Sequence, residues 1–258
     1  MPKFAANLTM LFTEMPFLDR FAAAAAAGFT AVEFLFPYEY EPQQIATLLE
    51  GHGLSLVLHN LPAGNWAAGE RGIACHPDRV AEFRAGVARA IAYAIPLGCP
   101  RLNCLAGILP AGVAPAEARS TLVDNLRFAA AALREAGIAL VLEPVNTRDV
   151  PGFFVPTTRA ALSIIDEAGE DNLKLQYDIY HAQVMEGDIA RSIETNLDRI
   201  GHMQLADNPG RHEPGTGELN YPYLFARIDD LGYRGWIGCE YKPRTTTIAG
   251  LAWLDGCR

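Results

Sequence analysis

The sequence predicts an α/β fold, a single-domain (β/α)₈ barrel that spans residues 1–258. Short apolar segments with β-branched residues alternate with longer segments of helical character, and this alternation repeats along the whole chain. It yields eight strands, and eight parallel strands with intervening helices close into a barrel. No linker rich in Ser, Gly or Pro divides the chain. An open, doubly wound sheet is the structural alternative.

Eight segments have the composition of strands buried on both faces. Segment 138–142 is typical, since apolar residues follow one another there without a polar interruption. Such continuous runs characterise parallel sheets, which helices cover on both sides. The predicted strands are 4–10, 31–36, 54–60, 101–107, 138–144, 173–181, 200–207 and 236–242.

The segments between these strands are predicted to be helical. Several have Pro near the first turn, where its fixed φ and missing N–H are tolerated, and Gly directly after the last turn. The predicted helices are 17–27, 42–51, 77–95, 115–136, 156–168, 189–197 and 221–231. Segment 243–258, after the last strand, is short for a full closing helix.

Two connections, 61–76 and 208–220, are long and rich in Gly. Each follows the end of a predicted strand. Because the loops after barrel strands form the active-site face, we expect both to act as lids or substrate walls. Trp66 and Phe153 lie in loops that either cover the site or form a subunit contact, so a homodimer remains an open alternative.

The composition disfavours several classes of function. The net charge is −9, so the dense basic face that nucleic-acid binding requires is not expected. No segment approaches the roughly 18 consecutive apolar residues of a membrane span, and no signal-peptide cleavage site follows the first apolar run. The five cysteines include no Cys-x-x-Cys spacing. Their odd number favours buried thiols in a reducing compartment, and therefore a cytoplasmic protein.

Four consecutive strands finish with an oxygen-bearing side chain, namely Glu143, Asp178, Gln204 and Glu240. The carboxyl ends of barrel strands converge on one mouth, so we expect these side chains to share a pocket. Three carboxylates brought together repel one another unless a cation lies among them. Oxygen ligands suit Mg²⁺ or Mn²⁺ better than zinc. The alternative for any single acid is a helix cap or an ion pair with a loop arginine.

Five further side chains are candidates for substrate binding. His181 lies just beyond a strand tip, where it reaches a substrate oxygen or caps the following helix, and His59 ends the third strand on the predicted site face or in its core. An anionic substrate would need a cation in this otherwise negative pocket, and Arg71, Arg211 and Lys242 are the candidates. Guanidinium binds a carboxylate through two parallel hydrogen bonds, which an ammonium group does not reproduce.

Several motifs resemble one known family. The segments "LVLEPVN", "LQYDIYHAQ", "GHMQLADNPGRHEPGTGELNY", "GCEYKP" and "HNLPAGNWAAGERGIACHPDR" are similar to the hydroxypyruvate isomerase family of xylose-isomerase-like TIM barrels. The resemblance extends from Phe4 to about Leu254. It implies a divalent metal, Mg²⁺ or Mn²⁺, whose ligands would be the four strand-end residues Glu143, Asp178, Gln204 and Glu240.

The same resemblance implies the reaction. Glu143 and Glu240 would serve as the acid/base pair that interconverts hydroxypyruvate and tartronate semialdehyde through an enediol. The alternatives are an isomerase of the four-carbon 2-oxotetronate and a ketose 3-epimerase. Sugar 3-epimerases of this superfamily usually carry His where Gln204 stands, which disfavours the epimerase.

Two functions of other classes are also disfavoured. A DNA-repair endonuclease on this barrel needs a histidine-rich three-zinc cluster and a basic groove, whereas the six histidines are scattered and the net charge is −9. A non-catalytic sugar-acid binder would not require both glutamates.

Overall fold

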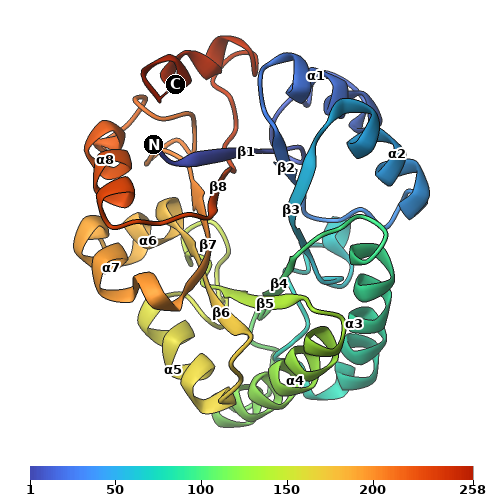
Figure 1. Cartoon of the computed structure of the whole chain (residues 1–258). Helices are drawn as coiled ribbons and strands as arrows, with labels where there is room; N and C mark the ends of the chain where they lie inside the picture. Colours follow the sequence, from blue (N-terminus) through green and yellow to red (C-terminus); the bar gives the residue numbers. More distant parts are fainter. Residues whose placement is uncertain (258) are drawn as a thin grey trace.

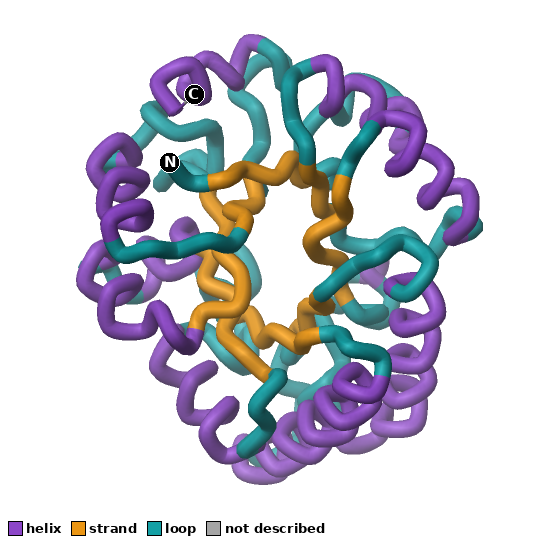
Figure 2. The backbone as a smooth tube through the Cα atoms, viewed as in Figure 1, coloured by secondary structure: helices purple, strands orange, loops and turns teal. Residues whose placement is uncertain are grey.

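The computed structural model describes residues 1–257 and contains a closed barrel of eight parallel strands in sequence order. Figure 2 shows these strands inside a ring of helices. The strands are β1 Lys3–Asn7, β2 Ala31–Glu33, β3 Ser55–Asn60, β4 Arg101–Leu105, β5 Ala139–Glu143, β6 Leu173–Asp178, β7 Ile200–Leu205 and β8 Trp236–Cys239. Strand β1 pairs with both β2 and β8, so the sheet has no open edge. The predicted barrel is confirmed, and the open sheet is excluded.

Helices surround the barrel on all sides (Figure 1). The α-helices are α1 Arg20–Ala26, α2 Pro42–His52, α3 Val80–Ala94, α4 Pro115–Glu135, α5 Thr158–Ala168, α6 Ile179–Met185, α7 Ile189–Asn196 and α8 Tyr221–Asp230. The 3₁₀ helices are η1 Phe17–Asp19, η2 Trp66–Ala68, η3 Pro77–Arg79, η4 Leu197–Arg199 and η5 Ala249–Cys257. The 3₁₀ helix η5 lies in segment 243–258, which was expected to be short for a full closing helix.

Glycine directly follows the ends of two helices, as predicted. Gly53 and Gly169 follow α2 and α5 with φ of 64° and 72°, in the left-handed region. Glycine adopts this conformation without the steric cost that a side chain brings, which is why it ends helices.

Several predicted strand ends were wrong, since segments 4–10, 31–36 and 236–242 end as strands at Asn7, Glu33 and Cys239. The segment 173–181 was expected to be a strand throughout, but β6 ends at Asp178 and α6 follows immediately. The Asp178 carboxylate accepts a hydrogen bond from the Tyr180 amide at 2.8 Å, which caps the new helix. His181 therefore lies in the first turn of α6 rather than in extended chain.

The core between the sheet and the helices is apolar. In α4, the buried residues Ala118, Leu122, Leu126, Ala129 and Leu133 recur at helical spacing and form one face. This face belongs to the same apolar cluster as Leu140 and Leu142 of β5. Burial of that stripe holds α4 on the barrel wall, so the strand ends inside the barrel remain fixed.

Candidate active site

Every strand places a buried polar side chain at or near its carboxyl end. We call this set the polar ring: Asn7, Glu33, Asn60, Asn103, Glu143, Asp178, Gln204 and Glu240. Hydrogen bonds connect the members across neighbouring strands, for example from Asn103 Nδ2 to Glu143 Oε2 at 2.6 Å and to Asn60 Oδ1 at 3.2 Å. Sequence reasoning found the four members from β5 to the end of β8 and missed the four from β1 to β4. The signal was present, because Asn7, Glu33 and Asn60 are the last residues of their strands.

The three predicted acids meet at the barrel mouth. Glu143, Asp178 and Glu240 are buried, and one ligand atom of each, together with one of His181, lie within 4.8 Å of one another. Glu143 and Asp178 end β5 and β6, and Glu240 directly follows β8. The expectation that distant strand ends converge is thus met for these acids, although only Glu143 and Glu240 line the cavity at the mouth.

Gln204 lies beside this cluster, level with Asp178 in the β6–β7 register. Its Nε2 donates to Glu33 Oε1 at 2.7 Å, and its Oε1 accepts from Gln176 Nε2 at 2.6 Å. The amide is therefore held from both ends.

Burial and mutual repulsion perturb the acids strongly. Burial raises the pKa of Glu240 to about 8 and that of Asp178 to about 6, although the Arg211 guanidinium opposes both shifts. Burial, followed by the charges of Glu240 and Asp178, raises the pKa of Glu143 well above its ordinary value. Without a further cation, the three groups do not all ionise near neutral pH.

The donor set fits a divalent cation. Asp178 Oδ1 accepts the α6 capping bond, but Asp178 Oδ2 is buried with no hydrogen-bond donor. A buried carboxylate oxygen without a partner is costly. A Mg²⁺ or Mn²⁺ ion would satisfy this oxygen together with those of Glu143 and Glu240, since both ions prefer oxygen ligands.

His181 presents a hydrogen-bond donor to the cluster rather than a lone pair. Its Nδ1 faces the backbone N–H of Asn146 at 3.4 Å and Asn146 Nδ2 at 2.6 Å. The orientation of that amide is fixed, because Asn146 Oδ1 accepts from the Asp149 backbone N–H at 2.8 Å. Nδ1 is therefore the acceptor, and Nε2 carries the proton. Nε2 lies 3.5 Å from both Asp178 Oδ2 and Arg211 NH2, and the much shorter contact at Nδ1 decides the tautomer. Burial lowers the pKa of His181 well below its ordinary value, which keeps the ring neutral.

Arg211 reaches the cluster from the loop after β7. Its NH2 lies 2.6 Å from Glu240 Oε2 and 3.7 Å from Asp178 Oδ2. The residue has a φ of 53°, and the Lys242 backbone N–H donates to its carbonyl at 2.8 Å. Arg211 thus supplies part of the positive charge that the buried acids require.

The loop that carries Arg211 is held by one buried carboxylate. Asp207 Oδ1 and Oδ2 accept backbone hydrogen bonds of 2.9–3.1 Å from Asn208, Gly215, Thr216, Gly217 and Leu219. Gly217 is required there, because a Cβ would lie 2.0 Å from the Asn208 carbonyl oxygen. This predicted site wall is therefore an ordered loop.

A cavity of about 120 Å³ opens above the acids. Its polar lining comprises Asn60, Arg71, Glu143, His181, Arg211 and Glu240, and its other walls include Met10, Leu35, Trp66, Leu105, Val145, Val150 and Phe153. Arg71 NH1 donates to the carbonyl oxygens of Trp66 and Glu70 at 3.1 and 2.7 Å, and its guanidinium lies 4.1 Å from the centre of the Trp66 ring. Both long loops therefore contribute walls, as predicted.

Two predicted substrate-binding residues do not line this cavity. His59 is buried beside the Phe34 ring, with its Nδ1 3.1 Å from the Asn60 carbonyl oxygen, and the neighbouring Asn60 lines the cavity instead. Lys242 is exposed, and its backbone rather than its side chain holds the Arg211 loop.

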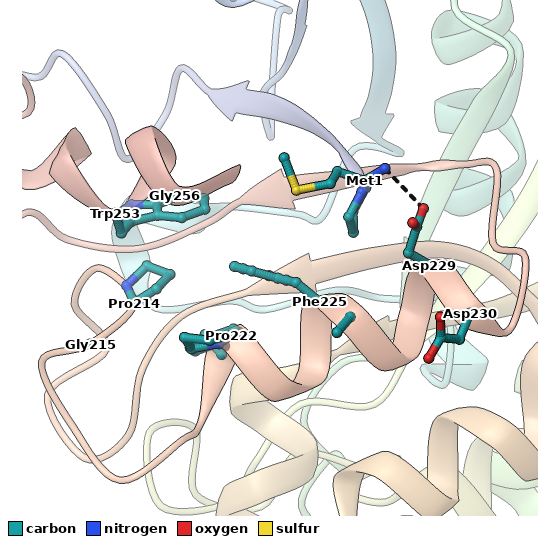
Figure 3. Close-up of a pocket in the computed structure, with 12 residues that line it drawn as sticks. Met1, Pro214, Gly215, Pro222, Phe225, Asp229, Asp230, Trp253 and Gly256 are labelled. Carbon is teal, nitrogen blue, oxygen red and sulfur yellow. Dashed lines mark ion pairs between the residues drawn. The ribbon is translucent and has the colours of Figure 1, made fainter. Parts of the chain in front are cut away.

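A larger cavity of about 440 Å³ lies outside the barrel, between the N-terminus, α8 and the C-terminal segment (Figure 3). Phe225, Pro222 and Trp253 form much of its wall, and an ion pair of 3.0 Å joins the Met1 amino group to Asp229 at its edge. None of the mouth residues borders it, so it is separate from the acid cluster.

The sequence model of the xylose isomerase-like TIM barrel family matches residues 21–257. Hydroxypyruvate isomerase of Escherichia coli is 55% identical over 258 residues, which is 100% of both chains. The chain belongs to the hydroxypyruvate isomerase family. The predicted family is confirmed.

Two further relatives extend this comparison. A 2-oxo-tetronate isomerase of Cupriavidus necator is 52% identical over 98% of both chains. The crystal structure of a protein named AP endonuclease, family 2, from Brucella melitensis is 47% identical, with a TM-score of 0.97 over 100% of both chains. No helix within residues 1–257 has the length and apolar character needed to cross a membrane.

Proposed function

We propose that this chain is a metal-dependent isomerase that interconverts hydroxypyruvate and tartronate semialdehyde (2-hydroxy-3-oxopropanoate). The observation that carries this proposal is the meeting of Glu143 and Glu240 with Asp178 and a proton-bearing His181 nitrogen at the floor of one small cavity, which both glutamates and His181 line. The identity of 55% to a hydroxypyruvate isomerase supports it.

The reaction moves one hydrogen between adjacent carbons. A C–H bond at the hydroxymethyl carbon breaks, a C–H bond forms at the former carbonyl carbon, and one proton passes between the two oxygens. Glu143 and Glu240 are suited to the carbon-bound proton, since both are buried and their pKa values are raised toward or above neutrality. A carboxylate with a raised pKa is a stronger base, and its conjugate acid returns the proton at neutral pH.

The metal would be held by Glu143, Asp178, Gln204 and Glu240. When bound, Mg²⁺ or Mn²⁺ supplies Lewis-acid stabilisation of the negative charge that develops on substrate oxygens. His181 contributes a second source of stabilisation, because its Nε2–H points toward the same cluster.

Arg71 is the best partner for the substrate carboxylate. Arg211 already pairs with Glu240 and Asp178, whereas Arg71 has no ion pair with a carboxylate among residues 1–257. The carbonyls that accept from its NH1 fix the guanidinium plane, which leaves its other N–H groups for a carboxylate.

The three-carbon acid is the favoured substrate, because the relative named hydroxypyruvate isomerase is 55% identical. The four-carbon 2-oxotetronate is the alternative, because a relative that is 52% identical carries that name. Incubation of the Mn²⁺-loaded protein with each acid tests the proposal, and turnover of neither would refute both alternatives.

Within residues 1–257, the site does not have the ligands that an endonuclease of this barrel type would need, although the Brucella protein carries that name. In the described part of the chain, the acid cluster contains a single histidine. His59 and His202 are committed elsewhere, to the Asn60 carbonyl and to Glu33. A histidine-rich three-zinc centre is therefore not assembled at this mouth.

We also propose a cytoplasmic location. Cys75, Cys99 and Cys104 are buried thiols, and burial raises the pKa of Cys75 and Cys99 to about 12. Such thiols are unreactive structural residues, as expected in a reducing compartment. Fractionation of cells that produce the protein tests this location.

A further inference from the structure

Glu33 is the central acceptor of a buried network beneath the acid cluster. Its carboxylate is fully buried at the end of β2. Oε1 accepts from Asn7 Nδ2 at 2.9 Å and from Gln204 Nε2 at 2.7 Å, and Oε2 lies 2.6 Å from His202 Nε2. Strand β8 makes room for it, since a Cβ on Gly238 would lie 2.2 Å from Oε1. The barrel is thus shaped around a carboxylate that the proposed reaction does not use.

The Arg101 guanidinium determines which ring nitrogen of His202 carries the proton. Arg101 NH1 lies 3.3 Å from His202 Nδ1, and a guanidinium group only donates hydrogen bonds. Nδ1 is therefore an acceptor, and the proton of His202 resides on Nε2, which donates to Glu33. Every partner of the Glu33 carboxylate is a donor, so both of its oxygens serve as acceptors.

An acceptor at this place selects one orientation of Gln204. An amide offers an oxygen at one end and N–H donors at the other, and the two ends have nearly the same shape. Because Glu33 accepts only, Gln204 must direct Nε2 toward it, and Oε1 then lies on the opposite side of the amide. A reversed amide would direct its N–H groups toward a bound cation and its oxygen toward another anion.

We propose that Glu33 is a positioning residue for the metal site. It holds Gln204 Nε2, so that Oε1, which accepts from Gln176 Nε2 at 2.6 Å, keeps its second lone pair for a cation. Glu33 is also linked to a second proposed ligand through Asn7. The Asn7 Nδ2 group donates to Glu33 and lies 3.5 Å from Glu240 Oε1. The inference rests on the proposed metal site and extends it to the opposite side of the barrel. Partners of this type typically alter metal affinity by 10- to 100-fold.

Mn²⁺ binding to the full-length protein, measured by titration calorimetry, tests this role without any substrate. In Glu33→Gln the side chain can donate as well as accept, so only Gln176 still favours the present orientation of the Gln204 amide, and Mn²⁺ affinity should fall by about 10- to 100-fold. The double variant Glu33→Gln/Gln204→Glu exchanges the two groups and keeps the net charge. A glutamate at position 204 has oxygen at both ends, so most of the lost affinity should return. Glu167→Gln, an exposed carboxylate paired with Arg119, is the matched control and should bind Mn²⁺ like the parent.

The outcomes separate positioning from a merely structural role. Parent-like Mn²⁺ affinity in Glu33→Gln would overturn the inference. So would a weakened Glu33→Gln whose affinity is not improved by Gln204→Glu, and so would a parent that does not bind Mn²⁺. A parent that binds Mn²⁺ but converts neither acid would refute the proposed function alone, because the binding comparison does not depend on turnover.

Discussion

Replacement of Asp178 by Asn should stabilise the metal-free protein and abolish its response to Mn²⁺. Burial raises the pKa of Asp178 from 3.8 to about 6, so the folded state favours the protonated carboxyl. That contribution to stability is fully present below about pH 4 and is lost as the pH rises through about 6. At 1.36 kcal/mol per pKa unit, the ionised carboxylate costs on the order of 3 kcal/mol at pH 8. Asparagine remains neutral and still accepts the capping bond from Tyr180 through its amide oxygen.

The assay is thermal unfolding in a chelator at pH 5 and pH 8, followed by the addition of Mn²⁺. For a chain of this size, each kcal/mol changes Tm by roughly 2–4 °C. The advantage of Asp178→Asn should be small at pH 5 and should reach several degrees at pH 8. Mn²⁺ at 100 times its Kd should stabilise the parent by about 2.7 kcal/mol and leave the variant nearly unchanged. Asp166→Asn, on an exposed carboxylate paired with Arg199, is the matched control and should show neither effect.

The reasoning fails if Asp178→Asn is less stable than the parent at pH 8 in the chelator. It also fails if the variant keeps the full stabilisation by Mn²⁺. Either result would mean that the unpartnered Asp178 oxygen is neither a cost to the metal-free fold nor a ligand.

Three further predictions concern turnover. Glu143→Gln and Glu240→Gln should each lower kcat by about 10²–10⁴-fold with unchanged circular dichroism, and parent-like rates would contradict their acid/base roles. Arg71→Lys should raise KM for the acid about tenfold or more, because lysine loses two-pronged carboxylate binding; an unchanged KM would exclude Arg71. His181→Gln should reduce kcat by about 10²-fold yet retain Mn²⁺ affinity, since Nε2 carries a proton; loss of metal binding in calorimetry would identify His181 as a ligand instead.

The side of the sheet to which each side chain points was harder to predict than the positions of the strands. His59 was expected on the site face, but Asn60 lines the cavity. Strand β3 is buried along almost its whole length, so it lacks the alternation of polar and apolar residues that would reveal which face points inward. A shift of one residue exchanges the two faces.

The strand-end acids could be predicted without this information, because a buried carboxylate is itself unusual. A carboxylate at the tip of a buried apolar run is costly unless it has a partner, so Glu143 and Asp178 stand out without any knowledge of the fold. The missed residues Asn7, Glu33 and Asn60 carry the same kind of signal, but each has an ordinary alternative as a strand terminus or turn residue.

The order of residues is enough to establish the alternation of strands and helices, the closure into eight units and the acids at the mouth, because these depend on local hydrophobic patterns and on the cost of burying charge. The hydrogen bonds that orient those acids and their neighbours emerge only in three dimensions. Gln204 and Glu33 are 171 positions apart, and the tautomer of His181 depends on Asn146 from another strand end. Such contacts arise when the barrel closes and brings polar side-chain atoms of distant segments within about 3 Å of one another, which no local pattern encodes.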